Sequence, residues 1–176
     1  MLPAMENRRT LILMRHAQTE ETRPGSHDTD RRLTAHGEQQ ARDAGDFLRD
    51  QGMVIDTVLC SSAARTRRTL ELLELNDGAA TDISVRYYNA GTDTLIEAIR
   101  ALSDDCHTAL LVGHAPAVPG LVHELCDEAT SHPEAFSSVA NRFPAGTIAR
   151  LEFDGSWAEV GTSRLVSARY PDSADR

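Results

Sequence analysis

Seven residues near the start of the chain decide its fold class: Thr10-Leu11-Ile12-Leu13-Met14-Arg15-His16. Their apolar members form one continuous run that is bounded by charge on both sides. A short run of this kind is typical of a strand buried on both faces of a parallel sheet. The run ends at Arg15 and His16, so two side chains capable of chemistry follow the predicted strand directly.

Further apolar runs and helical patterns alternate along the rest of the chain. The predicted strands cover Thr57–Cys60, Ser84–Tyr88 and Thr108–Gly113. The predicted helices cover residues 34–51, 64–75 and 92–102, and a stretch from Pro116 or Pro119 to about Leu125. Thr34 is a suitable N-cap for the first helix. Residues 126–144 are predicted to be irregular, and residues 147–153 and 157–160 to form a closing hairpin. The alternation predicts a three-layer α/β/α sandwich with a mainly parallel central sheet.

The length of the chain is suited to one domain. With 176 residues and 40% hydrophobic content, the chain can bury a single substantial core. We expect an N-terminal leader over residues 1–9, the domain over residues 10–166, and a polar C-terminal tail over residues 167–176.

Charge and cysteine usage exclude several classes of protein. A formal net charge of -9 argues against binding to nucleic acid or to anionic lipid. The three cysteines show no CxxC spacing, and their odd number leaves one thiol without a disulfide partner, which favours a reducing compartment. Since the early apolar run is too short for a signal peptide or a membrane span, we expect a cytoplasmic protein without a membrane segment.

Three of the predicted strands end in polar residues that could form one site. Arg15 and His16 follow the first strand, residues 61–65 follow the second, and His114 follows the fourth. Ligand sites in parallel sheets form beyond the carboxyl ends of the strands, so we expect these side chains to meet. Arginine forks match the oxygens of a phosphoryl group and stay charged. The sequence therefore predicts a phosphoryl site.

Four blocks of sequence carry a family resemblance. They read Met14-Arg15-His16-Ala17-Gln18-Thr19, then Leu33-Thr34-Ala35-His36-Gly37-Glu38-Gln39-Gln40-Ala41, then Ser61-Ser62-Ala63-Ala64-Arg65-Thr66-Arg67-Arg68-Thr69, then Val112-Gly113-His114-Ala115-Pro116. In this order, the blocks resemble those of the histidine phosphatase superfamily, also called phosphoglycerate-mutase-like. The short length and the missing cap insertion are most similar to the SixA-type phosphohistidine phosphatases. Ala17 stands where the family commonly has glycine.

The resemblance implies a role for each member of the predicted site. His16 is expected to attack phosphorus and to form a phosphohistidine, with a backbone carbonyl fixing its tautomer. Arg15, Arg65 and His114 are expected to bind the phosphoryl oxygens and to stabilise the transition state. No step requires a metal or another cofactor. Residues expected to line the phosphate site are Thr19, Arg32, Ser62 and Asn89.

The chain departs from the family at the general acid. Members that act on phosphate monoesters usually carry a glutamate after the third strand, where this chain has Asn89. An amide cannot protonate an alkoxide leaving group, whereas the P–N bond of phosphohistidine is labile without such help. The departure favours phosphohistidine or another activated substrate. Asp93 and Glu97 remain alternative acids if the register differs by a turn.

Three functions stay open from the sequence. The first is a phosphatase acting on a phosphorylated protein, such as a histidine-containing phosphotransfer domain. The second is a phosphomonoesterase acting on a small phosphorylated molecule, with Asp93 or Glu97 as acid. The third is a non-catalytic phosphate-binding module. The spacing of His, Cys and Asp predicts no metal site, and Asp28 and Asp30 are expected to orient Arg31, Arg32 or their loop. Residues 127–142 could form a lid or a partner surface.

Overall fold

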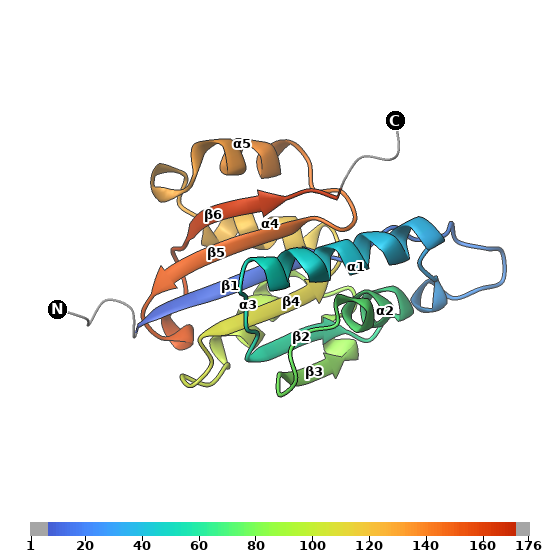
Figure 1. The fold of residues 1–176 in the computed structure, drawn as a ribbon, viewed down its shortest axis with the longest axis horizontal. Coiled ribbons are helices and arrows are strands. Elements are labelled where there is room, and N and C mark those ends of the chain that lie inside the picture. Colours follow the sequence, from blue (N-terminus) through green and yellow to red (C-terminus); the bar gives the residue numbers. More distant parts are fainter. Residues whose placement is uncertain (1–6, 172–176) are drawn as a thin grey trace.

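A six-stranded sheet forms the centre of the molecule, with the strand order β3-β2-β4-β1-β5-β6 (Figure 1). The computed structural model describes residues 7–171, so most of the expected leader and the last five residues of the expected tail lie outside the described residues. The strands are β1 (Arg8–Arg15), β2 (Thr57–Ser61), β3 (Ala80–Ser84), β4 (Thr108–Gly113), β5 (Ile148–Asp154) and β6 (Arg164–Arg169). Among them, β5 alone runs against the others. The mainly parallel sheet predicted from the sequence is confirmed.

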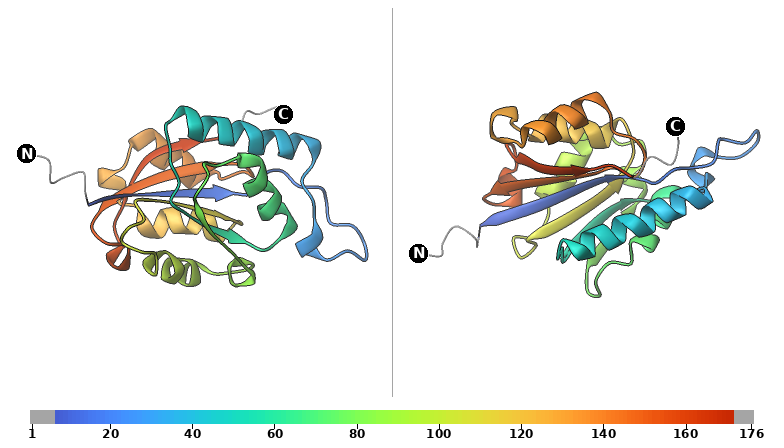
Figure 2. Two further views of the ribbon diagram at one scale, coloured as in Figure 1. Left: turned by 60° about the horizontal axis from the view of Figure 1, so that its bottom comes forward. Right: turned by 45° about the horizontal axis from the view of Figure 1, so that its top comes forward.

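Helices cover both faces of this sheet, as the two views of Figure 2 show. On one face lie α1 (Ala35–Asp50) and α2 (Ala64–Leu73); on the other lie α3 (Thr92–Arg100), α4 (Ala117–Leu125) and α5 (Pro133–Asn141). Short 3-10 helices are η1 (Asp28–Asp30), η2 (Val85–Tyr87), η3 (Glu128–Thr130) and η4 (Trp157–Glu159). The three-layer α/β/α sandwich is therefore confirmed. No helix of the described residues is both long and apolar enough to cross a membrane.

The deciding stretch forms β1 in the middle of the sheet. Leu11 and Leu13 belong to the core beneath α3, α4 and α5, whereas Ile12 and Met14 belong to the core beneath α1 and α2. All four side chains are buried, because a central strand between two helical layers has no solvent face. Burial on both faces explains why the run is continuous rather than alternating.

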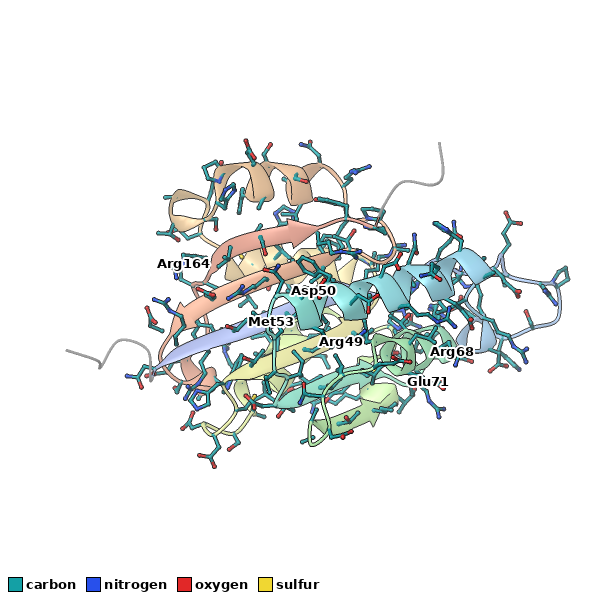
Figure 3. All side chains as sticks on the ribbon, viewed as in Figure 1. Arg49, Asp50, Met53, Arg68, Glu71 and Arg164 are labelled. Carbon is teal, nitrogen blue, oxygen red and sulfur yellow. The ribbon has the colours of Figure 1, made fainter. Side chains whose placement is uncertain are left out.

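The start of α1 packs closely on the segment that follows β1. The Thr34 side chain accepts a hydrogen bond from the Gly37 amide, which confirms the predicted N-cap. A Cβ at position 37 would lie 2.0 Å from the Gln18 carbonyl oxygen, so only glycine permits this approach. At the other end of the helix, Arg49 donates to the carbonyls of Leu73 and Glu74 at the end of α2 (Figure 3). Both ends of α1 are thereby fixed.

The strand predicted over Ser84–Tyr88 is wrong, because β3 comes earlier at Ala80–Ser84. The Ser84 hydroxyl accepts from the Arg86 amide and begins the 3-10 helix η2, which ends the extended conformation. Most of β3 is exposed at the edge of the sheet, so its sequence lacks the apolar run that identifies a buried strand.

The C-terminal third differs from prediction in three places. The region predicted to be irregular contains α5, and the predicted strand over residues 157–160 is absent, because Trp157–Glu159 form η4. Trp157 is fully buried and donates to the Cys106 carbonyl, so this segment contributes a side chain to the hydrophobic core. β5 instead pairs with β6, which includes residues 167–169 of the expected tail.

Candidate active site

His16 lies just beyond the carboxyl end of β1, with 5% of its surface exposed. Its amide donates to the Gly113 carbonyl at 3.0 Å, and its ring Nδ1 lies 2.8 Å from the Ala17 carbonyl oxygen. A carbonyl oxygen only accepts, so Nδ1 carries the proton and Nε2 keeps its lone pair. The predicted backbone contact is therefore present, and it presents Nε2 as the free nucleophilic atom.

The surroundings of His16 keep its ring neutral. Burial, together with the charges of Arg65 and Arg15 and the interaction with His114, lowers the pKa of His16 to about 3, against the opposing effect of the Ala17 hydrogen bond. The lone pair on Nε2 is thus available throughout the neutral pH range.

Arg65 lies in the first turn of α2, which begins at Ala64, and is 4% exposed. Its two terminal nitrogens donate to Asp28, one to the carbonyl oxygen at 2.8 Å and one to Oδ2 at 3.0 Å. The Thr69 hydroxyl donates to the Arg65 carbonyl at 2.7 Å and accepts from the Ala17 amide at 3.1 Å. This pair of bonds links the helix that carries Arg65 to the residue beside the nucleophile.

His114 follows β4 and faces His16, with 5.4 Å between the ring centroids. Its Nε2 lies 2.8 Å from the Ser61 hydroxyl, which also accepts from the Ala63 amide at 3.4 Å. The Ser61 hydroxyl can donate to Nε2 or accept from it, so either tautomer of His114 satisfies this contact. Burial, followed by the charge of Arg65, lowers the pKa of His114 to about 4. This ring is neutral as well.

Arg15 and Arg31 complete a concentration of positive charge. Arg15 donates to the Phe143 carbonyl at 2.9 Å, and its pKa is lowered by burial and by the charges of Arg31 and Arg65. Four buried nitrogens of the cluster have no hydrogen-bond partner among the described residues: Arg15 Nε, Arg31 Nε, Arg65 Nε and His114 Nδ1. Unpaired donors of this kind fit the oxygens of an anion.

The structure brings the four main predicted residues together, whereas no described side-chain contact joins the secondary ones to them. Thr19 forms an isolated bridge with Leu33, and the Ser62 amide donates to the Ser84 carbonyl. Asn89 is exposed with a φ of 54°. Arg32 is exposed and lines an outer hollow of its loop, and no described contact joins it to the cluster. Arg31, the residue before it, takes the place expected of Arg32.

Sequence reasoning missed three polar partners of the cluster: Ser61, Thr69 and Tyr88. Tyr88 donates to Asp28 Oδ2 at 2.7 Å, and its ring lies edge-on to His114 with 5.7 Å between centroids. Asp28 was expected to orient Arg31 or Arg32, and it does lie 3.5 Å from Arg31, but its contacts with Arg65 were not anticipated. Ser61 and Thr69 lie within the block from Ser61 to Thr69 that carries the resemblance, whereas nothing in the local sequence marks Tyr88 as a partner of the cluster.

The carboxylates proposed as general acids lie apart from the cluster in all described contacts. Glu97 pairs with Arg86 at 2.8 Å, and 76% of its side chain is exposed. Asp93 is exposed in the first turn of α3. The carboxylate in contact with the cluster is Asp28, whose pKa is lowered by the hydrogen bond from Tyr88 and by Arg65. It is therefore ionised at neutral pH and has no proton to give.

No group of three or more His, Cys, Asp or Glu side chains within residues 7–171 is arranged to hold a metal ion. The donors of the site are nitrogen atoms that carry or share protons, and such groups suit an anion rather than a cation.

Comparison with known proteins identifies the family to which this chain is similar. A model of the histidine phosphatase superfamily (branch 1) matches residues 11–90. An uncharacterised protein of Mycobacterium leprae is 35% identical over 146 residues, which cover 82% of this chain and 89% of that protein. A structure from Nakamurella multipartitia, provisionally described as the phosphohistidine phosphatase SixA, is 34% identical with a TM-score of 0.84 and covers 94% of this chain and 97% of that one. The protein histidine phosphatase SixA complexed with tungstate has the same fold, with a TM-score of 0.76 at 24% identity over 94% of this chain and 99% of that one.

A parallel sheet that gathers neutral histidines and arginines beyond its carboxyl edge is typical of proteins that handle phosphoryl groups. The sequence matches specify the class further. The chain belongs to the histidine phosphatase superfamily.

Proposed function

We propose that this protein is a metal-independent phosphatase that hydrolyses phosphohistidine, or another activated phosphoryl group, through a phosphorylated His16. The observation that carries the proposal is the fixed tautomer of His16 among arginines, with Nδ1 bonded to the Ala17 carbonyl. The named relatives of the SixA type add support.

In the first step, Nε2 of His16 attacks phosphorus in line with the bond to the leaving group. A neutral ring needs no base to activate it, so the attack depends on alignment rather than on proton removal. The P–N bond of the substrate breaks as the new P–N bond forms, and the substrate ring, protonated on its other nitrogen, takes the electron pair of the broken bond and leaves as neutral imidazole. Water then attacks the phosphorylated His16, which releases inorganic phosphate and restores the ring.

The arginines stabilise the charge that spreads over the phosphoryl oxygens. Arg15 and Arg65 offer charge-assisted hydrogen bonds from a buried site, where such bonds are stronger than in water. His114 adds a neutral imidazole with one N–H donor. These groups are already held by protein contacts, so little reorganisation accompanies the reaction.

The lack of a strong proton donor for the leaving group favours an activated substrate. Asn89 cannot donate a proton to a leaving oxygen, Asp28 is ionised, and its hydrogen bond raises the pKa of Tyr88. An alkoxide leaves slowly without a proton, whereas an imidazole or a nitrophenolate leaves readily. We therefore place phosphohistidine, rather than a sugar phosphate, as the substrate, and a phosphorylated protein as its source.

Steady-state hydrolysis in EDTA tests this proposal with three substrates: a phosphohistidine peptide, p-nitrophenyl phosphate and a sugar phosphate. The expected result is cleavage of the first two, little cleavage of the third, and loss of all activity in His16→Ala. Sugar phosphate hydrolysis at a rate equal to that of the peptide would select the small-molecule phosphomonoesterase with its own acid. Phosphate binding without hydrolysis of any substrate would select the non-catalytic module.

A further inference from the structure

One carboxylate ties the arginines of the site to the loop between β1 and α1. Asp28, in η1, accepts from Arg65 at both its carbonyl oxygen and Oδ2, at 2.8 and 3.0 Å. Oδ2 also accepts from the Tyr88 hydroxyl at 2.7 Å, and Oδ1 lies 3.5 Å from the terminal nitrogen of Arg31. A single residue thus contacts three donors from three separate segments.

The contact with Asp28 leaves Arg65 able to bind a phosphoryl group. A guanidinium has five N–H bonds, and Asp28 occupies one on each terminal nitrogen. Nε is buried without a partner among the described residues, so the edge formed by Nε and a terminal nitrogen remains for two oxygens of the substrate. Asp28 therefore holds Arg65 in place without competing for all of its donors.

The same carboxylate offsets the repulsion between neighbouring arginines. Arg15, Arg31 and Arg65 are close enough for the charges of the last two to lower the pKa of the first. Arg65 is 4% exposed, so water compensates little of this repulsion. Asp28 contacts two of the three guanidinium groups and supplies the negative charge between them.

We propose that Asp28 is the positioning residue of the site: by contacting Arg65 and Arg31 together, it sets the orientation in which both arginines meet the transferring phosphoryl group. Asp28 acts through the terminal nitrogens of Arg65 rather than on a reacting atom. The Tyr88 hydroxyl donates to the same Oδ2 and helps to hold the carboxylate. The inference rests on the proposed function, because it assigns Asp28 a role in that same phosphoryl transfer.

The variant Asp28→Asn tests the inference with Asp30→Asn as a matched control. Asp30 is an exposed carboxylate of the same 3-10 helix. For the phosphohistidine peptide we expect kcat of Asp28→Asn to fall at least about tenfold, with KM changing less than about threefold, because misplaced arginines cost most in the transition state. Asp30→Asn should retain both constants, and Asp28→Glu should recover part of the lost kcat.

Inorganic phosphate binding, measured by isothermal titration calorimetry, separates positioning from two other roles. Positioning predicts that Asp28→Asn binds phosphate more weakly than the wild type, at an unchanged melting temperature. Tighter phosphate binding with full kcat would overturn the inference and make Asp28 a competitor for Arg65. Unchanged kcat and phosphate affinity would overturn it as well, and reduce Asp28 to a loop anchor.

The titration also distinguishes failure of the inference from failure of the proposed function. If the wild type hydrolyses the peptide and Asp28→Asn does so equally well, the inference alone fails. If the wild type hydrolyses nothing, the proposed function fails. Weaker phosphate binding by Asp28→Asn would then still support the positioning of the arginines, and undiminished binding would contradict it.

Discussion

The two sides of the candidate pocket are built differently. On the phosphoryl side, His16 and Arg65 are almost fully buried and each is held by hydrogen bonds to the backbone. The residues expected to serve the leaving group differ: Asn89 and Asp93 are exposed, and Glu97 is paired with Arg86 away from the cluster. The cluster therefore gathers donors suited to a phosphoryl group, and no protonated carboxyl group among the described residues contacts it.

This difference indicates where specificity arises. Electrostatic stabilisation acts on any phosphoryl group, whereas protonation is needed only when the leaving group is a strong base. A site with the first and without the second selects substrates by the lability of the bond it breaks. The substitutions in the following predictions remove groups that act on the phosphoryl group, add an acid for the leaving group, or test the burial of His16.

The largest effect is expected from removing the nucleophile. His16→Ala should lower kcat for the phosphohistidine peptide by at least about 10⁴-fold, because no other group of the site can form the covalent intermediate. Rapid quench with a ³²P-labelled donor should trap acid-labile label on the wild type and none on the variant. A labelled His16→Ala protein would show that another residue is the nucleophile.

Arg65→Ala should have the next largest effect, a loss of about 10²- to 10³-fold in kcat/KM. Its buried guanidinium is expected to bind two phosphoryl oxygens, and Arg65→Lys should recover little because an ammonium lacks the planar fork. Arg67→Ala, an exposed position on the same helix, is the control. Equal losses in both variants would place the effect in helix α2 rather than in the site.

Strengthening the leaving-group side should change the substrate preference. Asn89→Asp introduces an acid, and the φ of 54° is tolerated by aspartate. We expect about a tenfold gain in hydrolysis of a sugar phosphate, with little change for the phosphohistidine peptide, measured as the ratio of the two kcat/KM values. Asp93→Asn should leave that ratio unchanged, and a loss of sugar phosphate hydrolysis in Asp93→Asn would identify Asp93 as the acid.

The last prediction concerns stability against acid rather than activity. The pKa of His16 is about 3 in the folded protein against about 6.5 when unfolded, so the unfolded chain binds the extra proton between these values. Stability is therefore retained above pH 6.5 and is lost as the pH falls toward 3, by about 1.4 kcal/mol per pH unit from this residue. Urea denaturation at several pH values should show that the free energy of unfolding depends less steeply on pH for His16→Gln than for the wild type. His27→Gln, at an exposed loop position, is the control, and an unchanged slope in His16→Gln would contradict the buried neutral ring.

Local sequence patterns predicted the elements that bury a clear apolar face. The run Leu11–Met14 identified β1, and the spacing of Ala41, Ala44 and Leu48 identified α1. The pattern failed for α5, where Val139 is the only fully buried residue of the helix, and for the exposed edge strand β3. A segment that buries little apolar surface carries little periodicity to interpret.

The sequence by itself determined the sandwich, the family resemblance, and the gathering of Arg15, His16, Arg65 and His114 at strand ends, since parallel strands place their carboxyl ends along one edge. Only the tertiary structure decided that Arg31 joins the cluster instead of Arg32, and that Asp28 contacts Arg65 and Tyr88. These partners lie 37 and 60 residues further along the chain. The sequence of a loop has no periodic pattern from which the direction of a side chain can be predicted. The partners of such a side chain are fixed only when distant segments pack together.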